Sequence, residues 1–109
     1  MRLTFLGKST QGGGSPTLFA TDRQTYVVQG WKVPGEVASV EIPKRLLTHL
    51  EPSTALGAGL RDTGRDSYVL SGVPVTDTGA LSQMDMPSHE TCVEVGKIRE
   101  GDDLGAAAE

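Results

Sequence analysis

The sequence predicts an α+β fold dominated by strands, in a single domain with two short helices. Its length of 109 residues is that of one domain. It holds 14 glycines and 6 prolines, so its elements are short and joined by many turns. Apolar and polar residues also alternate along most segments, with the period of two that is typical of a half-buried strand. We expect this domain to span residues 1–99.

Six segments carry the alternation that predicts strands, and the strongest of them is 25–33. Along it Val27 and Trp31 share one face, and Tyr26 and Val28 share the other. Because both faces carry apolar groups, we expect a central strand that is covered on both sides. A turn at 22–24 leads into it. The predicted strands are, in order, 2–6, 17–21, 25–33, 37–42, 67–75 and 91–95.

Two short helices are expected between the strands. Pro43 suits the first position of a helix, because the N–H that proline lacks would be unpaired there. Three leucines then form an apolar stripe, and Pro52 ends the helix. The second helix covers about residues 78–84, with Asp77 as its N-cap. Residues 11–16, which hold three consecutive glycines, can only form a loop.

The two halves of the chain resemble each other. At an offset of 42 residues, seven of the 18 positions in 18–35 are identical, whereas background composition gives about one. The identical pairs are Leu18/Leu60, Thr21/Thr63, Arg23/Arg65, Tyr26/Tyr68, Val27/Val69, Gly30/Gly72 and Val33/Val75. Residues 40–44 resemble 93–97 at an offset of 53, which places an insertion of 11 residues in the second half.

Two explanations of this likeness stay open. The chain is either an internal duplication, with units at 1–52 and 53–99, or two β-rich segments that share strand chemistry. Two copies are too few for a solenoid, but they suit a pseudo-symmetric single domain. The paired glycines, Gly30 and Gly72, lie inside strands and predict either a close approach of another group or a bulge.

Charge and hydropathy argue against a nucleic-acid-binding, membrane or secreted protein. The formal net charge is −4, and the acidic excess lies in the second half, which argues against unassisted binding to a phosphate backbone. No apolar run approaches the roughly 18 residues of a membrane helix, and Lys8 interrupts any signal-peptide core. The single cysteine, Cys92, fits a reducing compartment. We expect a cytoplasmic protein with a flexible tail at 100–109.

No motif predicts catalysis. Residues 7–10 copy the end of a phosphate-binding loop, but Arg2 stands where that motif needs its first glycine. His89 and Cys92 are near each other in sequence, yet on a strand they point to opposite faces and cannot share a metal. We therefore expect no catalytic residue, no metal and no cofactor, and the protein is not predicted to be an enzyme.

Four residues are candidates for contact with a partner. Trp31 and Lys32 lie near the end of the central strand, where a tryptophan beside a lysine can anchor a protein partner. The only tryptophan of a small domain can equally belong to its core. Lys44 and Arg45 open the first helix, where they form either a small basic patch or an ordinary solvated face.

The segments 2–8 and 17–33 resemble small uncharacterised actinobacterial proteins that are often encoded beside helix-turn-helix regulators and their small acidic partner proteins. The resemblance covers about residues 1–45, and residues 87–95 are similar to that family's closing strand. It implies a regulatory association by gene neighbourhood and supplies no catalytic residues. One departure is that Val33 leads almost directly to 40–44, where the family usually inserts a helix first.

A second resemblance is to swapped-hairpin transcription factors of the antitoxin type. It rests on the strand-to-helix junction Ile42-Pro43-Lys44. Those proteins continue with a leucine-glycine pair and a Gly-Asp turn, whereas this chain has Leu50-Glu51-Pro52.

Two functions are therefore expected as alternatives. The first is a small cytoplasmic interaction module, a regulatory partner of a transcription regulator or a homodimer, acting through its strand edges and the region of Trp31. The second is a regulator that binds DNA directly through Lys44 and Arg45 and resembles the swapped-hairpin factors.

Overall fold

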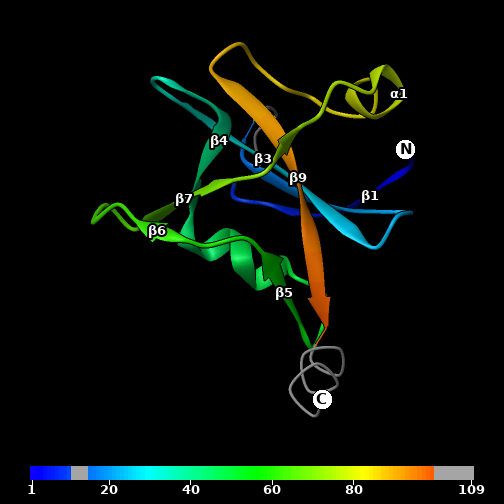
Figure 1. The fold of residues 1–109 in the computed structure, drawn as a ribbon, viewed down its shortest axis with the longest axis horizontal. Coiled ribbons are helices and arrows are strands. Elements are labelled where there is room, and N and C mark those ends of the chain that lie inside the picture. Colours follow the sequence, from blue (N-terminus) through cyan, green and yellow to red (C-terminus); the bar gives the residue numbers. More distant parts are fainter. Residues whose placement is uncertain (11–14, 100–109) are drawn as a thin grey trace.

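Nine strands and two short helices follow one another in the part of the chain that the computed structural model describes, residues 1–10 and 15–99 (Figure 1). All nine strands belong to one antiparallel sheet, so the strand-dominated fold class is confirmed. The strands are β1 (Leu3–Lys8), β2 (Thr17–Thr21), β3 (Thr25–Val33), β4 (Glu36–Pro43), β5 (Thr54–Gly57), β6 (Arg61–Asp62), β7 (Ser67–Ser71), β8 (Val73–Pro74) and β9 (Glu90–Arg99). The helices are the 3-10 helix η1 (Lys44–His49) and α1 (Thr78–Leu81).

The sheet closes on itself to form a small barrel. Strand β3 pairs with β9, and β9 pairs with β8. Only Gly72 separates β8 from β7, which pairs with β4, and β4 returns to β3. The other strands extend this circuit: β1 and β2 lie beside β3, β5 beside the end of β9, and β6 beside β7.

Two hydrophobic clusters lie on opposite sides of the strands. The larger cluster fills the barrel and consists of Leu18, Ala20, Tyr26, Val28, Val40, Ile42, Leu46, Leu56, Leu70, Val93 and Val95. The smaller cluster lies outside the barrel, where Val27 packs with Phe19 and Cys92. Because Tyr26 and Val28 face inward and Val27 faces outward, β3 is covered on both sides, as its sequence predicts. Burying each large apolar side chain contributes about 1.5–3 kcal/mol.

Several predicted elements are confirmed. Strands β2 and β3 begin and end at the predicted residues, with the turn at 22–24 between them. The Asp77 carboxylate caps α1, since its Oδ1 accepts hydrogen bonds from the backbone N–H groups of Gly79 and Ala80 at 2.8 and 3.2 Å. The described part of the chain contains no helix with the length and apolarity needed to cross a membrane. The predicted tail at 100–109 and loop residues 11–14 lie outside the described residues.

Both predicted helices differ in detail from the structure. Pro43 is the last residue of β4, with an extended ψ of 144°, so the first helix begins at Lys44 and forms a 3-10 helix instead of an α-helix. The second helix ends at Leu81. The Ser82 N–H still donates to Thr78, but those of Gln83 and Met84 donate to carbonyls three residues earlier. Such bonds tighten the chain into 3-10 turns.

The second half contains two strands that the sequence did not reveal. Residues 54–57, which look like turn and loop, pair as β5 with the end of β9. They do so because β9 continues to Arg99 and offers its edge there. Strand β6 likewise pairs with β7 over two residues. The predicted strand 67–75 is also divided at Gly72 into β7 and β8.

The two strand glycines allow close contacts of the backbone. A Cβ atom on Gly30 would lie 2.6 Å from the carbonyl oxygen of Glu41, and one on Gly72 would lie 2.6 Å from that of Glu94. Both distances are too short for any side chain, so the predicted close approach is confirmed.

Strand β4 pairs with β7 in the same register as β9 pairs with β3. Glu41 lies opposite Val69, and Glu94 lies opposite Val27. Glu94 corresponds to Glu41 at the offset of 53, and Val69 corresponds to Val27 at the offset of 42. Each of these pairings joins one half of the chain to the other.

Candidate functional site

The outer surface of the barrel has a covered face and an open face. The covered face consists of Phe19, Val27 and Cys92, and the segment 76–87 lies over it. Leu81 and Met84 of that segment pack against it. The side chain of Gln83 accepts a hydrogen bond from the backbone N–H of Leu3 at 3.0 Å and ties the segment to β1.

The open face consists of the accessible valines at the end of β3 and on β4 and β8: Val33, Val37 and Val73. The neighbouring Ser39 and Val69 are buried. A short turn joins β3 to β4, with φ of 78° at Gly35. The connection from β8 to β9, by contrast, contains the whole covering segment. The side chains of Val37 and Val73 are accordingly 90% and 67% exposed. Exposed apolar side chains mark a contact surface where they form a patch.

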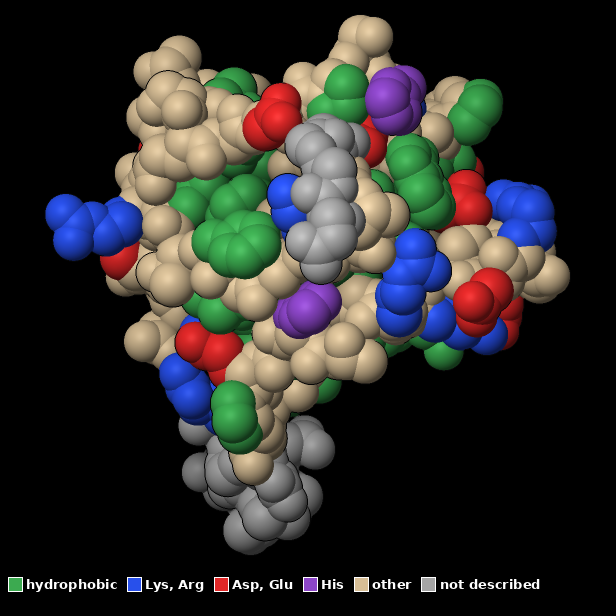
Figure 2. Space-filling view, turned by 180° about the vertical axis from the view of Figure 1, so that it is seen from behind, with side chains coloured by type: hydrophobic (Ala, Val, Ile, Leu, Met, Phe, Trp, Pro, Cys, Tyr) green, Lys and Arg blue, Asp and Glu red, His purple; other side chains and the backbone are tan. Residues whose placement is uncertain are grey.

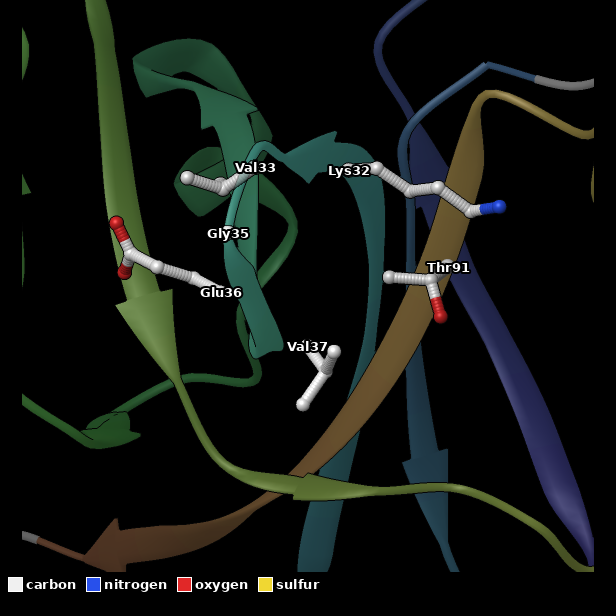
Figure 3. Close-up of a pocket in the computed structure, with 6 residues that line it drawn as sticks. All are labelled: Lys32, Val33, Gly35, Glu36, Val37 and Thr91. Carbon is white, nitrogen blue, oxygen red and sulfur yellow. The ribbon is translucent and has the colours of Figure 1, made fainter.

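A shallow cavity of about 260 Å³ opens beside this face, between the β3–β4 hairpin and β9 (Figure 3). Its lining residues are Lys32, Val33, Gly35, Glu36, Val37 and Thr91. Cavities that enclose a drug-sized ligand have volumes of roughly 300–1,000 Å³. This one is smaller and open, so it suits a side chain of a partner better than a cofactor.

Polar groups on the open face are held in place by one another. The Glu36 carboxylate accepts hydrogen bonds from Arg61 and from the Ser39 hydroxyl, each at 3.1 Å. Ser39 is also 2.7 Å from the Ser71 hydroxyl. The bond from Arg61, followed by that from Ser39, lowers the pKa of Glu36 below its usual value. The carboxylate therefore stays charged and paired.

One of the four predicted contact residues, Lys32, lines the cavity beside the open face, and Trp31 precedes it on β3. Trp31 is half-buried and belongs to neither hydrophobic cluster of the described residues, so it is not a core tryptophan. Lys32 is exposed and lines the cavity. In Figure 3 the Lys32 and Glu36 side chains extend to opposite sides of the hairpin.

The other two predicted residues lie on η1 and have partners within the chain. The Lys44 ammonium is 2.7 Å from the Asp62 carboxylate and 5.0 Å from the centre of the Tyr68 ring. The bond to Asp62 raises the pKa of Lys44 and lowers that of Asp62. Arg45 donates to the carbonyl oxygen of Ser9 at 3.2 Å. No hydrogen bond or ion pair found among the described residues joins Lys44 or Arg45 to Trp31 or Lys32.

Basic side chains do not form a continuous field on the face seen in Figure 2, where they are interspersed with acidic ones. At the predicted basic patch of Lys44 and Arg45, the charge of Lys44 is paired with Asp62.

Two polar clusters with the same design link the halves. Glu41 accepts hydrogen bonds from Ser67 and Arg65, at 2.5 and 3.1 Å. In the corresponding cluster, Glu94 accepts hydrogen bonds from Thr25 and Arg23, at 2.6 and 2.8 Å. Ring contacts agree with this correspondence, since the pair Lys44 and Tyr68 corresponds to Lys97 and Tyr26, each with 5.0 Å from nitrogen to ring centre.

A buried carboxylate lies beside the covered face. Glu90 is 3% exposed, and its Oε1 accepts a hydrogen bond from Gln29 at 2.7 Å. Its Oε2 has no hydrogen bond within the described residues and lies 3.5 Å from the His89 ring. Burial raises the pKa of Glu90. In the first half the corresponding residue, at an offset of 53, is the exposed Val37.

The cysteine does not have the setting of a nucleophile. Cys92 is buried, and that burial raises the pKa of its thiol to about 11. Reactive cysteines instead have lowered pKa values and partial exposure. Over the described ranges, 1–10 and 15–99, histidine, cysteine and acidic side chains nowhere form a group of three that could hold a metal ion.

Sequence reasoning missed Val37, Val73 and Arg61 as surface residues of interest. A signal for Val37 was present, because the alternation along 36–43 places it opposite Val40 and Ile42, which face the barrel interior. Nothing local marked Val73, whose exposure depends on how β8 lies against β9.

Comparisons with protein-family models, with curated proteins and with solved structures found no match to this chain.

Proposed function

We propose that this protein is a small, non-enzymatic interaction module that binds a protein partner through its open face. The observation that carries the proposal is the exposure of Val37 and Val73 on a sheet face whose counterpart is covered. Burying apolar surface there contributes about 25 cal/mol per Å². The buried thiol of Cys92, with its raised pKa, supports the non-enzymatic part of the proposal.

We further infer that the domain is a pseudo-symmetric duplication of one strand unit. The equivalent pairings of Glu41 and Glu94, the two polar clusters and the two glycine contacts support this inference. A duplicated fold explains why one outer face is covered and the other open: the covering segment coincides with the insertion of 11 residues in the second half.

A transcription regulator is the partner we propose. The support is the resemblance to actinobacterial proteins encoded beside helix-turn-helix regulators, which implies a regulatory association by gene neighbourhood. A cytoplasmic location is part of the proposal and fits the single cysteine, Cys92. Lys32 lines the cavity beside the open face and would extend the contact, together with Trp31, which precedes it on β3.

Affinity capture with matched variants tests the proposal. The wild-type protein, the double variant Val37→Asp/Val73→Asp and the control Ile98→Asp are used as baits in a lysate of the producing organism. Ile98 is a 45% exposed aliphatic residue at the far end of β9. We expect a stoichiometric partner to bind the wild type and the control but not the double variant. Equal capture by all three baits would exclude the open face as the binding surface.

A homodimer is the other form of this proposal. Light scattering of the purified protein measures its mass, and we expect Val37→Asp/Val73→Asp to lower that mass if a second copy occupies the open face. A monomeric wild type that retains a stoichiometric partner would instead indicate a different protein as the occupant.

Direct DNA binding is the alternative proposal, and the strand-to-helix junction Ile42-Pro43-Lys44 favours it, because it resembles that of swapped-hairpin factors and joins β4 to η1. The ion pair between Lys44 and Asp62 weighs against it. A mobility shift with promoter fragments at low and moderate salt tests it, since binding through Lys44 and Arg45 must weaken as salt rises and be lost in Lys44→Ala/Arg45→Ala. No shift at low salt would end this alternative.

A further inference from the structure

We propose, on the premise that the open face binds a partner, that its occupant is a short helical turn of a protein partner. This turn would present aliphatic or methionine side chains to Val33, Val37 and Val73 and a carboxylate to Lys32. Three properties of the molecule support this occupant: the design of its covered face, the charge at the rim of the open face, and the size of the cavity.

The covered face shows what kind of segment suits this sheet. There the occupant is one turn of helix, α1, with its following residues. It presents Leu81, Met84 and Met86 to the small cluster around Val27. The open face lies on the corresponding strands, and its own short hairpin supplies no covering segment, so a partner segment can pack against the exposed Val37 and Val73.

The charges around the open face favour an acidic segment. Lys32 is exposed, and no ion pair is found for it within the described part of the chain. The one carboxylate of the cavity, Glu36, is bound to Arg61 and extends away from Lys32 (Figure 3). The cavity therefore has an unpaired positive charge at its rim, which a carboxylate of the partner complements.

The size of the cavity limits which side chain of a partner can enter it. Its volume of about 260 Å³, between Val37 and Thr91, is open to solvent and below that of a drug-sized ligand site. A leucine or methionine side chain from a helical turn fits this description, in the manner of an anchor residue at a protein interface.

The segment 76–87 of this chain provides a ready probe, because it carries Leu81, Met84 and Met86 together with Asp77 and Asp85. A synthetic peptide of these twelve residues is titrated into the isotope-labelled full chain, and the amide NMR signals are followed. We expect saturable shifts at residues 32–37 and at Val73, with a dissociation constant of about 1 mM. Shifts centred on Phe19, Val27 and Cys92 would show that the peptide displaces the chain's own segment 76–87 from the covered face, and would overturn the proposal.

Charge variants test the carboxylate. Lys32→Glu should weaken peptide binding about five-fold, the scale of one exposed ion pair. The same weakening is expected for a peptide in which both aspartates are replaced by asparagine. Arg2→Glu, another exposed basic residue, is the matched control and should bind as the wild type does. Equal binding by Lys32→Glu and the wild type would exclude an acidic occupant.

The outcomes separate this inference from the proposed function. If Val37→Asp/Val73→Asp loses a captured partner while the peptide gives no saturable shift, the partner-binding role stands and the helical-turn occupant is wrong. If that double variant captures its partner as the wild type does, the role of the open face fails as well. A wild-type dimer that the double variant dissociates would make a second copy the occupant and would also overturn the inference.

Discussion

The Glu41 carboxylate accepts two hydrogen bonds from the Arg65 guanidinium, each 3.1 Å long, across the boundary between the two halves of the chain. The Ser67 hydroxyl donates a third at 2.5 Å. Glu94 of the second half is bound in return by Arg23 and Thr25 of the first. Because each half supplies the donors for the carboxylate of the other, the two halves are expected to unfold together.

Glu41→Gln should lower the free energy of unfolding at pH 7 by about 1 kcal/mol, since it weakens charged hydrogen bonds that are only partly exposed. The bond from Ser67, and next those from Arg65, hold the pKa of Glu41 below its usual value of 4.5. A lowered folded pKa gives stability that is present above pH 4.5 and lost as the pH falls through the folded pKa. Urea unfolding measured from pH 7 downward should therefore show that the free energies of unfolding of the wild type and Glu41→Gln become equal in acid.

The counterpart residue provides a check on this result. Glu94→Gln should cause a loss of similar size at pH 7, because Arg23 and Thr25 bind Glu94 as Arg65 and Ser67 bind Glu41. Asp66→Asn is the control, since that side chain is exposed, and its effect should stay within about 0.5 kcal/mol. If Glu41→Gln and Glu94→Gln were both as stable as the wild type, the two polar clusters would have no structural role.

Gly30→Ala and Gly72→Ala should each destabilise the protein by about 2–3 kcal/mol. A methyl group at either position would meet a backbone carbonyl at 2.6 Å, which the strands can relieve only by moving apart. Gly59→Ala is the matched control, because nothing lies within 4 Å of its added Cβ. The midpoint of urea unfolding at constant slope measures the loss. A Gly30→Ala protein as stable as Gly59→Ala would show that the close approach is absent.

Local pattern in the sequence was enough to predict most of the inner fold. The bounds of β2 and β3 were predicted correctly because both strands carry apolar side chains on their inward and outward faces. The turn residues at 22–24 also mark where one strand ends and the other begins. Asp77 was predicted as a cap because its chemistry is local to α1. Pro43 was misassigned, because its fixed φ suits the end of a strand as well as the start of a helix.

Elements that depend on distant partners could not be predicted. Strand β5 exists because β9 passes beside it, and its four residues, Thr54–Gly57, are too few to show a strand pattern. The pairing of Lys44 with Asp62 could not be predicted, because the fold brings together two residues that are 18 positions apart. The open face could not be predicted for the same reason: the exposure of Val73 depends on the pairing of β8 with β9, and the covering segment packs on the other outer face, around Val27.

The Cys92 thiol should resist alkylation in the folded protein. It is buried against the covering segment, with its Sγ 3.8 Å from the Met84 sulfur, and burial raises its pKa to about 11. At pH 8 almost none of it is thiolate, the reactive form. Mass spectrometry after iodoacetamide treatment should find unmodified native protein and full modification in urea. Rapid labelling of the native protein would show that the covering segment opens readily.

Glu90→Gln should increase stability at alkaline pH relative to the wild type. Burial raises the pKa of Glu90, so the folded state of the wild type holds this proton more tightly than the unfolded state. Stability from such a group is complete below its unfolded pKa and is lost as the pH rises through the folded pKa. Glutamine keeps an oxygen for Gln29 and carries no charge, which should make the variant more stable by about 1 kcal/mol at pH 8 but not at pH 4.

Asp85 provides the control for this titration. Its charge contributes to the raised pKa of Glu90, so Asp85→Asn should make the loss of stability with rising pH smaller and end it at a lower pH. The free energy of unfolding is measured by urea for the wild type and both variants between pH 4 and pH 9, and the differences between proteins are compared. Wild-type stability exceeding that of Glu90→Gln at pH 8 would mean that the charged carboxylate is stabilised in the folded protein, against the direction that its burial implies.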